Sequence, residues 1–181
     1  MKVLVISDIH GIKTNLPLIK DKFSELKCEL LIVLGDLYYN YGRENAKDYD
    51  PEYVREFLDS FSDKMICMKG NCDEYLDVRD EPFDIIPDYF STKINDKTIY
   101  LTHGHIYNKN HWFKENSILL LGHTHIAEIT SIDSNIYINP GSISLPLGKE
   151  PASYMIIDDN KYIIADINDC IIYEKEILWV S

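Results

Sequence analysis

Five times in this chain, a short apolar run ends abruptly in an acidic, amide or imidazole side chain. Runs of Val, Ile, Leu and Met such as these are typical of strands that are buried on both faces in α/β proteins. The carboxyl ends of strands in an open α/β sheet border a shared crevice, so polar residues distant in sequence meet there. The residues that end the five runs are Asp8 with His10, Asp36, Asn71, His103 with His105, and His123 with His125.

The segments between these runs predict alternating strands and helices in the first half of the chain. Apolar residues recur at three- and four-residue spacing from Asn15 to Leu26, which indicates a helix with Pro17 tolerated in its first turn. A second helix is predicted over Pro51–Phe61. We expect the polar, glycine-containing segment Tyr38–Tyr49 to be the least ordered. The predicted strands are Val3–Ile6, Leu30–Leu34 and Met65–Met68.

The second half of the chain reads as mostly antiparallel strands with little helix. Tyr89–Ile94 and Thr98–Thr102 flank the turn residues Asn95-Asp96 and predict a hairpin. Further strands are predicted over Ile118–Leu121 and over residues 126–132, 135–138, 153–158, 161–167 and 170–178. This order of elements predicts two packed sheets with helices outside, in one α/β domain spanning residues 1–181.

The charge balance limits which partners the chain can bind. Asp and Glu number 30 against 18 for Lys and Arg, which gives a formal net charge of -12. A field of this sign repels long nucleic acids and anionic membranes, although bound divalent cations can reverse it locally for a small phosphate ester. The apolar runs are too short to span a membrane. The four cysteines fit neither a zinc ribbon nor a disulfide framework, so we expect free thiols and a cytoplasmic location.

The donor types at the strand ends favour a transition-metal site. Imidazole and carboxylate together suit Zn, Mn, Fe or Ni, whereas oxygen ligands alone would suit Mg or Ca. A carboxylate can bridge two cations, and Asp36 is the natural candidate for that bridge. Two metals roughly 3.5–4 Å apart activate a water and stabilise both the entering and the leaving oxygen of a phosphoryl displacement. The pattern therefore predicts hydrolysis of a phosphate ester.

The strand ends lie in five ordered motifs: Asp8-Ile9-His10, Gly35-Asp36, Gly70-Asn71-Cys72-Asp73, His103-Gly104-His105 and Gly122-His123-Thr124-His125. Together these motifs resemble those of the calcineurin-like metallophosphoesterase superfamily. The short chain, the cysteine in the third motif and the segment Asn139-Pro140-Gly141-Ser142 are similar to the small bacterial and archaeal phosphodiesterases of the YfcE type. The resemblance implies a four-layer α/β/β/α sandwich of two mixed sheets.

The same resemblance implies how two divalent ions would be held. Asp8, His10, Asp36 and His125 are implied for one ion, and Asp36, Asn71, His103 and His123 for the other. Mn²⁺ is the expected metal, with Ni²⁺, Fe²⁺ and Zn²⁺ as alternatives. The implied activity is that of a phosphodiesterase, which hydrolyses small phosphate diesters by attack of a metal-bridging hydroxide.

Four residues are predicted to take part in catalysis: Asn71, Cys72, Asp73 and His105. Asn71 would help to neutralise charge on the phosphate. Cys72 stands where many larger members of the superfamily have a histidine that protonates the leaving oxygen, so we expect a preference for esters with good leaving groups. Asp73 either positions its neighbours by hydrogen bonds or caps a turn. His105 would either orient His103 or touch the substrate phosphate, with a purely structural role as the alternative.

Two other functions remain as alternatives at this stage. The eukaryotic retromer subunit with the same fold is similar to this family and serves as a protein-binding module, so a non-catalytic scaffold is one alternative. A phosphomonoesterase is the other. The complete set of polar donors favours an enzyme, because burying unused polar groups is costly. A homo-oligomer is also an open expectation, for which Trp179 near the C-terminus is the indication.

Overall fold

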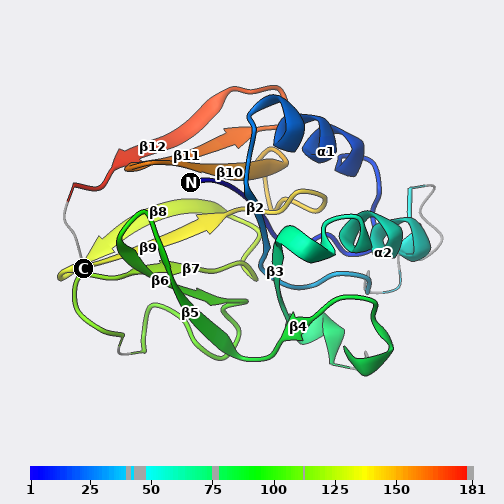
Figure 1. Cartoon of the computed structure of the whole chain (residues 1–181), viewed down its shortest axis with the longest axis horizontal. Coiled ribbons are helices and arrows are strands. Elements are labelled where there is room, and N and C mark those ends of the chain that lie inside the picture. Colours follow the sequence, from blue (N-terminus) through cyan, green and yellow to red (C-terminus); the bar gives the residue numbers. More distant parts are fainter. Residues whose placement is uncertain (40–41, 43–47, 75–77, 112, 179–181) are drawn as a thin grey trace.

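The computed structural model describes residues 1–39, 42, 48–74, 78–111 and 113–178. Most of the predicted irregular segment Tyr38–Tyr49 therefore lies outside the described residues, as does Trp179. Two sheets pack against each other, and both α-helices of the described chain lie on the same side of the sandwich (Figure 1).

One sheet has seven strands, and the N-terminal strand lies at its centre. Four strands run parallel: β1 (Lys2–Ile6), β2 (Leu30–Val33), β3 (Met65–Met68) and β4 (Ile85–Ile86). On the other side of β1, three strands continue antiparallel: β10 (Ser153–Asp158), β11 (Lys161–Asp166) and β12 (Ile171–Glu176). The order is β12-β11-β10-β1-β2-β3-β4, so the sheet is mixed as expected. The two-residue strand β4 was not predicted.

The other sheet has five strands in the order β5-β6-β7-β9-β8 and is also mixed. Its strands are β5 (Tyr89–Ile94), β6 (Lys97–Thr102), β7 (Ile118–Leu120), β8 (Ala127–Ile132) and β9 (Asn135–Pro140). β6, β7 and β9 run parallel. The predicted hairpin joins β5 and β6, and its turn residues Asn95 and Asp96 have φ of 49° and 64°, which suits a two-residue hairpin turn.

The helices are short and start where the sequence predicts. α1 covers Leu16–Glu25 and has Pro17 in its first turn. α2 covers Pro51–Asp59, and the Asp50 side chain caps it by accepting a hydrogen bond from the Tyr53 amide. Three single turns of 3₁₀ helix complete the set: η1 (Ser62–Lys64), η2 (Asn71–Asp73) and η3 (Val78–Asp80).

Apolar side chains fill three layers of the sandwich. Residues of α1 and α2, such as Ile19 and Phe57, pack on the outer face of the seven-stranded sheet. Alternate residues of that sheet, such as Val5 and Ile32, pack against the five-stranded sheet. The outer face of the five-stranded sheet is covered by a smaller cluster that includes Phe113.

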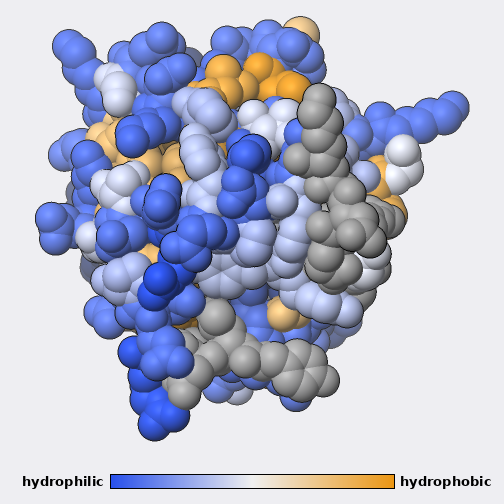
Figure 2. Space-filling model, turned by 90° about the vertical axis from the view of Figure 1, so that its right-hand side faces the viewer, coloured by the Kyte–Doolittle hydropathy of each residue, from blue (hydrophilic) through white to orange (hydrophobic). Residues whose placement is uncertain are grey.

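The predicted α/β sandwich of two mixed sheets is confirmed. The fourth layer differs in detail, because the segment 103–117 that covers the five-stranded sheet contains no helix among its described residues. The side of the molecule on which α2 lies is mostly hydrophilic with small hydrophobic patches (Figure 2), as the excess of acidic residues leads one to expect. No helix in the described ranges is long and apolar enough to cross a membrane.

Candidate functional site

Five of the seven predicted metal-binding residues have backbones in the left-handed region. Their φ values are 56° for Asp8, 52° for His10, 56° for Asp36, 71° for His123 and 59° for His125. This conformation is costly for residues with a Cβ and persists where the surrounding structure fixes it, most often at functional sites. Here the loops that follow β1 and β2 are tied together, since the amides of Asp8 and His10 donate to the carbonyls of Gly35 and Asp36.

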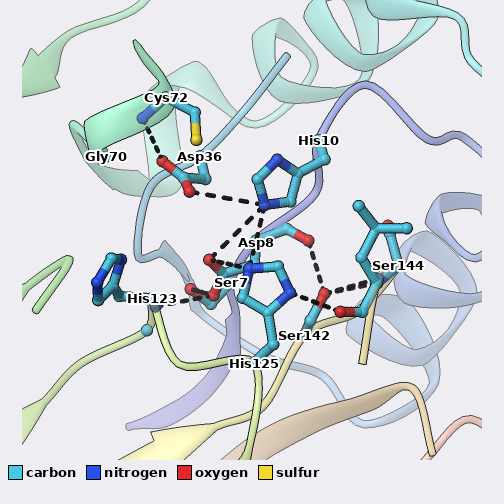
Figure 3. A network of polar contacts seen from close by, with 12 residues as sticks. Ser7, Asp8, His10, Asp36, Gly70, Cys72, His123, His125, Ser142 and Ser144 are labelled. Atoms are coloured by element: carbon cyan, nitrogen blue, oxygen red, sulfur yellow. Dashed lines mark hydrogen bonds and ion pairs between the residues drawn. The ribbon is translucent and has the colours of Figure 1, made fainter. Parts of the chain in front are cut away.

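Asp8, His10 and His125 form one half of the site, which we call the buried half. The Nε2 atoms of His10 and His125 lie 3.2 Å apart. Asp8 Oδ1 lies 3.3 Å from Nε2 of His125 and 4.0 Å from Nε2 of His10. In Figure 3, dashed lines join the His10 ring to both Asp8 and Asp36, and Asp36 Oδ2 is 3.6 Å from His10 Nε2. One donor atom from each of these four residues lies within 4.8 Å of every other, a spacing that fits one metal ion.

Asn71, His103 and His123 form the other half, which we call the open half. Asn71 Oδ1 lies 3.0 Å from Nε2 of His103 and 2.9 Å from Nδ1 of His123. Asp36 Oδ2 is 3.3 Å from His103 Nε2 and, on its other side, faces His10. The structure therefore brings all seven predicted residues together, with the Asp36 carboxylate between the two halves.

Backbone carbonyls orient three of the imidazole rings. Nδ1 of His10 donates to the Tyr39 carbonyl at 2.6 Å, Nδ1 of His103 to the Leu34 carbonyl at 2.7 Å, and Nδ1 of His125 to the Leu145 carbonyl at 2.5 Å. With the hydrogen held on Nδ1, the Nε2 lone pair of each neutral ring points toward carboxylate or amide oxygens. Lone pairs that face one another at these distances repel unless a cation or a proton lies between them.

An unsatisfied oxygen supports the same conclusion. Asp8 Oδ2 accepts hydrogen bonds from the Ser7 hydroxyl at 2.6 Å and from the His123 amide at 3.1 Å. Asp8 Oδ1 is buried, faces the two Nε2 atoms and has no hydrogen-bond partner. A buried carboxylate oxygen in this state is costly, and a divalent cation is the partner that would satisfy it together with the imidazoles. The residues present therefore fit a divalent metal.

The charges in the site are strongly coupled. Burial opposes ionisation of Asp36, but the hydrogen bond to His103, the positive charge of His103 and the hydrogen bond from the Cys72 amide together outweigh burial and lower the pKa of the carboxyl below its usual value. Burial opposes the charged form of His103, yet Asp36 and Asp8 raise its pKa to about 9. The pKa of His125 is raised by Asp8 despite burial, whereas burial and the neighbouring His103 lower the pKa of His123. Without metal, these shifts favour protonated His103 and His125 paired with the ionised carboxylates of Asp36 and Asp8.

Asp73 acts on the backbone around the site. It is 2% exposed, and its carboxylate accepts hydrogen bonds from the amides of Asp36, Leu37 and Gly70 at 2.8–2.9 Å. It thus holds the loop after β2 against the loop after β3. Burial raises its pKa, although the hydrogen bonds from the Gly70 and Leu37 amides oppose the shift. Asp73 thus makes hydrogen bonds that can position its neighbours as well as a capping contact within η2, and its role in catalysis stays a prediction.

Cys72 and Gly70 lie against the Asp36 carboxylate. The Cys72 amide donates to Asp36 Oδ1 at 2.8 Å, and the Asn71 side-chain amide donates to Cys72 Sγ at 3.3 Å, which leaves Asn71 Oδ1 facing the imidazoles. A Cβ on Gly70 would lie 2.1 Å from Asp36 Oδ1. The group that requires a glycine at this position is therefore the Asp36 carboxylate.

The segment Asn139-Pro140-Gly141-Ser142 supports the buried half from behind. Ser142 Oγ donates to the Asp8 carbonyl at 2.8 Å and accepts from the Leu145 amide. Asn139 binds the Gly122 carbonyl at 2.7 Å and also lines a pocket. Sequence reasoning missed Ser7, which directly precedes Asp8, and the carbonyls of Leu34, Tyr39 and Leu145. A main-chain carbonyl leaves no trace in the residue type, so only the structure identifies the latter.

His105 is exposed and lines two pockets beside the open half. One, of about 370 Å³, includes Lys69, Asn71 and Ile106; we call it the Lys69 pocket. The other, of about 260 Å³, includes His123 and Tyr137; we call it the Tyr137 pocket. The His105 ring is 5.4 Å from that of His103. Burial and the charge of His103 lower the pKa of His105.

Comparison with known proteins agrees with the geometry. Residues 1–161 match the calcineurin-like phosphoesterase superfamily domain. Phosphodiesterase YfcE of Escherichia coli (strain K12) is 32% identical over 173 residues, which cover 93% of this chain and 94% of the relative. A solved structure of the E. coli YfcE phosphoesterase matches with a TM-score of 0.89 at 29% identity, over 97% of this chain and 99% of that chain.

More distant relatives show how widely the fold is used. Phosphodiesterase MJ0936 of Methanocaldococcus jannaschii is 26% identical, over 78% of this chain and 83% of the relative. Vps29 of Entamoeba histolytica, solved as a complex with Zn²⁺, matches with a TM-score of 0.60 at 21% identity, over 98% of each chain. At that identity the likeness to Vps29 concerns the fold alone.

Proposed function

Because the chain belongs to the calcineurin-like phosphoesterase superfamily, we propose that it is a divalent-metal-dependent phosphodiesterase acting on small phosphate diesters. The observation that carries the proposal is the position of Asp36 Oδ2, 3.6 Å from Nε2 of His10 and 3.3 Å from Nε2 of His103. A single oxygen shared by two sets of donors is what a bridging ligand requires. The identity with YfcE over nearly the whole chain supports diester hydrolysis.

Two divalent ions per chain, with Mn²⁺ as the expected metal, are part of this proposal. When bound, such a pair supplies an activated water and neutralises the phosphoryl oxygens. Asp8, His10, Asp36 and His125 would hold one ion. Asp36, Asn71, His103 and His123 would hold the other.

The protein's own side chains would then fix the geometry of the reaction. The carbonyls of Leu34, Tyr39 and Leu145 keep three imidazoles in one tautomer, in which Nε2 is the ring nitrogen that would bind metal. Asp73 fixes the loops that carry Asp36 and Asn71. We place His105 at the mouth of the site, where an exposed imidazole with a lowered pKa is neutral near pH 7 and would hydrogen-bond a phosphate oxygen.

Cys72 is proposed to act through Asn71. Its sulfur accepts a hydrogen bond from the Asn71 amide, which turns the amide oxygen toward His103 and His123. A neutral thiol donates a proton poorly, so departure of the leaving group would depend on that group's own acidity. We expect Cys72→His to flatten the dependence of kcat on leaving-group pKa across a series of aryl diesters. An unchanged slope and an unchanged substrate ranking would contradict this role.

The remaining proposals concern the setting of the enzyme. Residues 1–181 act as one domain, which is supported by the pairing of β10 with β1 and by the core shared between the sheets. A cytoplasmic location is supported by four free cysteines. Homo-oligomerisation is supported by exposed Ile171 and Tyr173 on β12, the edge strand of its sheet.

The decisive experiment measures metal content and activity on the same preparation. Purified protein is analysed for bound metal and assayed with Mn²⁺, Ni²⁺, Zn²⁺ and Mg²⁺ against aryl diesters, cyclic-nucleotide diesters and aryl monoesters. We expect about two ions per chain and faster hydrolysis of diesters than of monoesters. A ranking led by monoesters would make the protein a phosphomonoesterase. Full metal occupancy without turnover of any ester would support the scaffold function instead.

A further inference from the structure

Two pockets lie beside the site, and each reaches one residue of the open half. The Lys69 pocket reaches Asn71, and the Tyr137 pocket reaches His123. Asn71 Oδ1 and His123 Nδ1 are only 2.9 Å apart, so both pockets open on the open half of the site. His105 belongs to the lining of both and forms the wall between them. A diester has two arms on one phosphorus, and this division fits them.

The Tyr137 pocket combines an apolar surface with unused hydroxyl groups. Leu121 and Tyr137 line it and belong to the apolar cluster on the outer face of the five-stranded sheet. The Tyr137 hydroxyl has no hydrogen-bond partner within the described part of the chain. Thr124 Oγ1 accepts from the Asn139 side chain and from the Ile126 amide, which leaves its own hydrogen to donate. Such a lining suits a ring that carries hydrogen-bond acceptors.

The charges of the two pockets differ. In the Tyr137 pocket, Lys109 and Glu128 pair at 3.5 Å and leave no net charge. The Lys69 pocket contains Glu74 and Asp88 beside Lys69, whose ammonium group has no ion-pair partner among residues that the structure describes. A charged or sugar-like arm is therefore better suited to the Lys69 pocket, and an uncharged planar arm to the Tyr137 pocket. A volume of about 260 Å³ admits one ring system and little more.

We propose that the Tyr137 pocket is a subsite for the planar ring of one ester arm, an aryl group or a nucleobase, with His105 separating it from the second arm. This assignment rests on the proposed phosphodiesterase function and names its substrate class: diesters with one aromatic arm. A ring in this pocket would stack against Tyr137 and Leu121 and accept hydrogen bonds from Thr124.

Binding of two small phosphonates tests the subsite without any turnover. Phenylphosphonate and methylphosphonate have the same head group for the metals, but only the first has a ring. With Mn²⁺-loaded protein in a calorimeter, we expect phenylphosphonate to bind about tenfold more tightly, because its ring is removed from water. Glu128 lines the pocket from strand β8, so Glu128→Phe should fill the pocket and remove that advantage while methylphosphonate binds as before.

Two variants control for effects unrelated to pocket volume. Ile132→Phe makes a similar change four residues along the same strand and on the same face, at an exposed position outside the pocket lining, and should keep the tenfold preference. Glu128→Gln removes the charge but not the space, and should also keep it. Each variant is first checked for metal content and for an unchanged unfolding curve.

The possible results separate the two proposals. Equal binding of the two phosphonates to the wild-type protein overturns the subsite and leaves the phosphodiesterase function standing. A phenyl preference that survives in Glu128→Phe places the ring outside the Tyr137 pocket and likewise overturns the assignment. Absence of binding by either phosphonate to metal-loaded protein removes the proposed function, and the subsite with it.

Discussion

The two halves of the site are built from similar side chains but differ in their access to solvent. In the buried half, Asp8 and His10 are fully buried and the His125 side chain is 18% exposed. In the open half, only His103 is fully buried, His123 is exposed, and two pockets reach its residues. Exclusion of water strengthens electrostatic interactions and slows exchange of a bound ion. We therefore expect the buried half to retain its ion and the open half to meet the substrate.

Replacing the shared carboxylate should damage both halves at once. In Asp36→Asn, the negatively charged carboxylate becomes a neutral amide. We therefore expect kcat on an aryl diester to fall by about 10³-fold or more. Metal content, measured by elemental analysis, should fall in parallel. The exposed Asp84→Asn serves as the matched control and should behave as wild type. Normal hydrolysis at normal metal content in Asp36→Asn would exclude the bridge.

The proton balance of the open half can be measured in metal-free protein. The folded-state pKa of His103 is about 9, above the usual 6.5. Its pairing with Asp36 therefore stabilises the fold fully below pH 6.5, and this stabilisation is lost as the pH rises through 9. The loss should reach about 3 kcal/mol between pH 6 and 9.5 in urea unfolding of chelator-treated protein.

His103→Gln should remove most of this pH dependence, and bound metal should mask it, because the metal replaces the proton. A wild-type protein whose metal-free stability is the same at both pH values would show that His103 is neutral throughout. That result would leave the open half held together by something other than the His103–Asp36 pair.

Adding one methyl group should disturb the buried half selectively. A Cβ on Gly122 would lie 1.9 Å from Ser7 Oγ and 2.8 Å from Asp8 Oδ2. We expect Gly122→Ala to lower the free energy of unfolding by about 2 kcal/mol and to weaken metal binding. Gly148→Ala is the control: its Cβ would meet nothing within 4 Å, and its φ of 70° costs about 1 kcal/mol without touching the metal site. Equal metal affinity in the two variants would contradict this reasoning.

Removing a single hydrogen bond should give the smallest effect. Ser7→Ala deletes the donor to Asp8 Oδ2, so the carboxylate can rotate and its free Oδ1 is held less firmly. Metal affinity of the buried half should fall about tenfold, as for other residues that orient metal ligands. Titration against a chromophoric chelator measures it, with Ser24→Ala on the outer surface of α1 as the control. If only the affinity for the more weakly bound ion fell, the prediction would be wrong, because Ser7 would then support the open half.

The sequence predicted the side chains of the site better than their supports. Asp8, Asp36 and His103 were found because apolar strands end at them, and the sheet brings such ends together. The hydrogen bonds that fix the rings come from the carbonyls of Leu34 and Tyr39 and could not be predicted, since any residue provides a carbonyl. Pairing of Asp73 with backbone amides across the sheet is a tertiary contact of the same kind.

Other parts of the fold were missed for physical reasons as well. The strand β4 has two residues, too few for a periodicity to appear. The outer cover of the five-stranded sheet lacks a helix in its described part, although the resemblance implied one, because a few aromatic residues such as Phe113 and Tyr107 suffice to cover Leu119 and Leu121. The pockets on either side of His105 depend on this irregular segment and have no signature in the sequence.

The position of β1 has a consequence for the order of events on the ribosome. β1 lies between β2 and β10, and it pairs with β10 from Lys2↔Asp158 to Val5↔Met155. The ring of His125 is oriented by the Leu145 carbonyl, and the Asp8 carbonyl by Ser142. A nascent chain that stops before these residues emerge has Asp8 and His10 but neither their scaffold nor an oriented His125. We therefore expect metal to be loaded late in biosynthesis, after these residues have emerged.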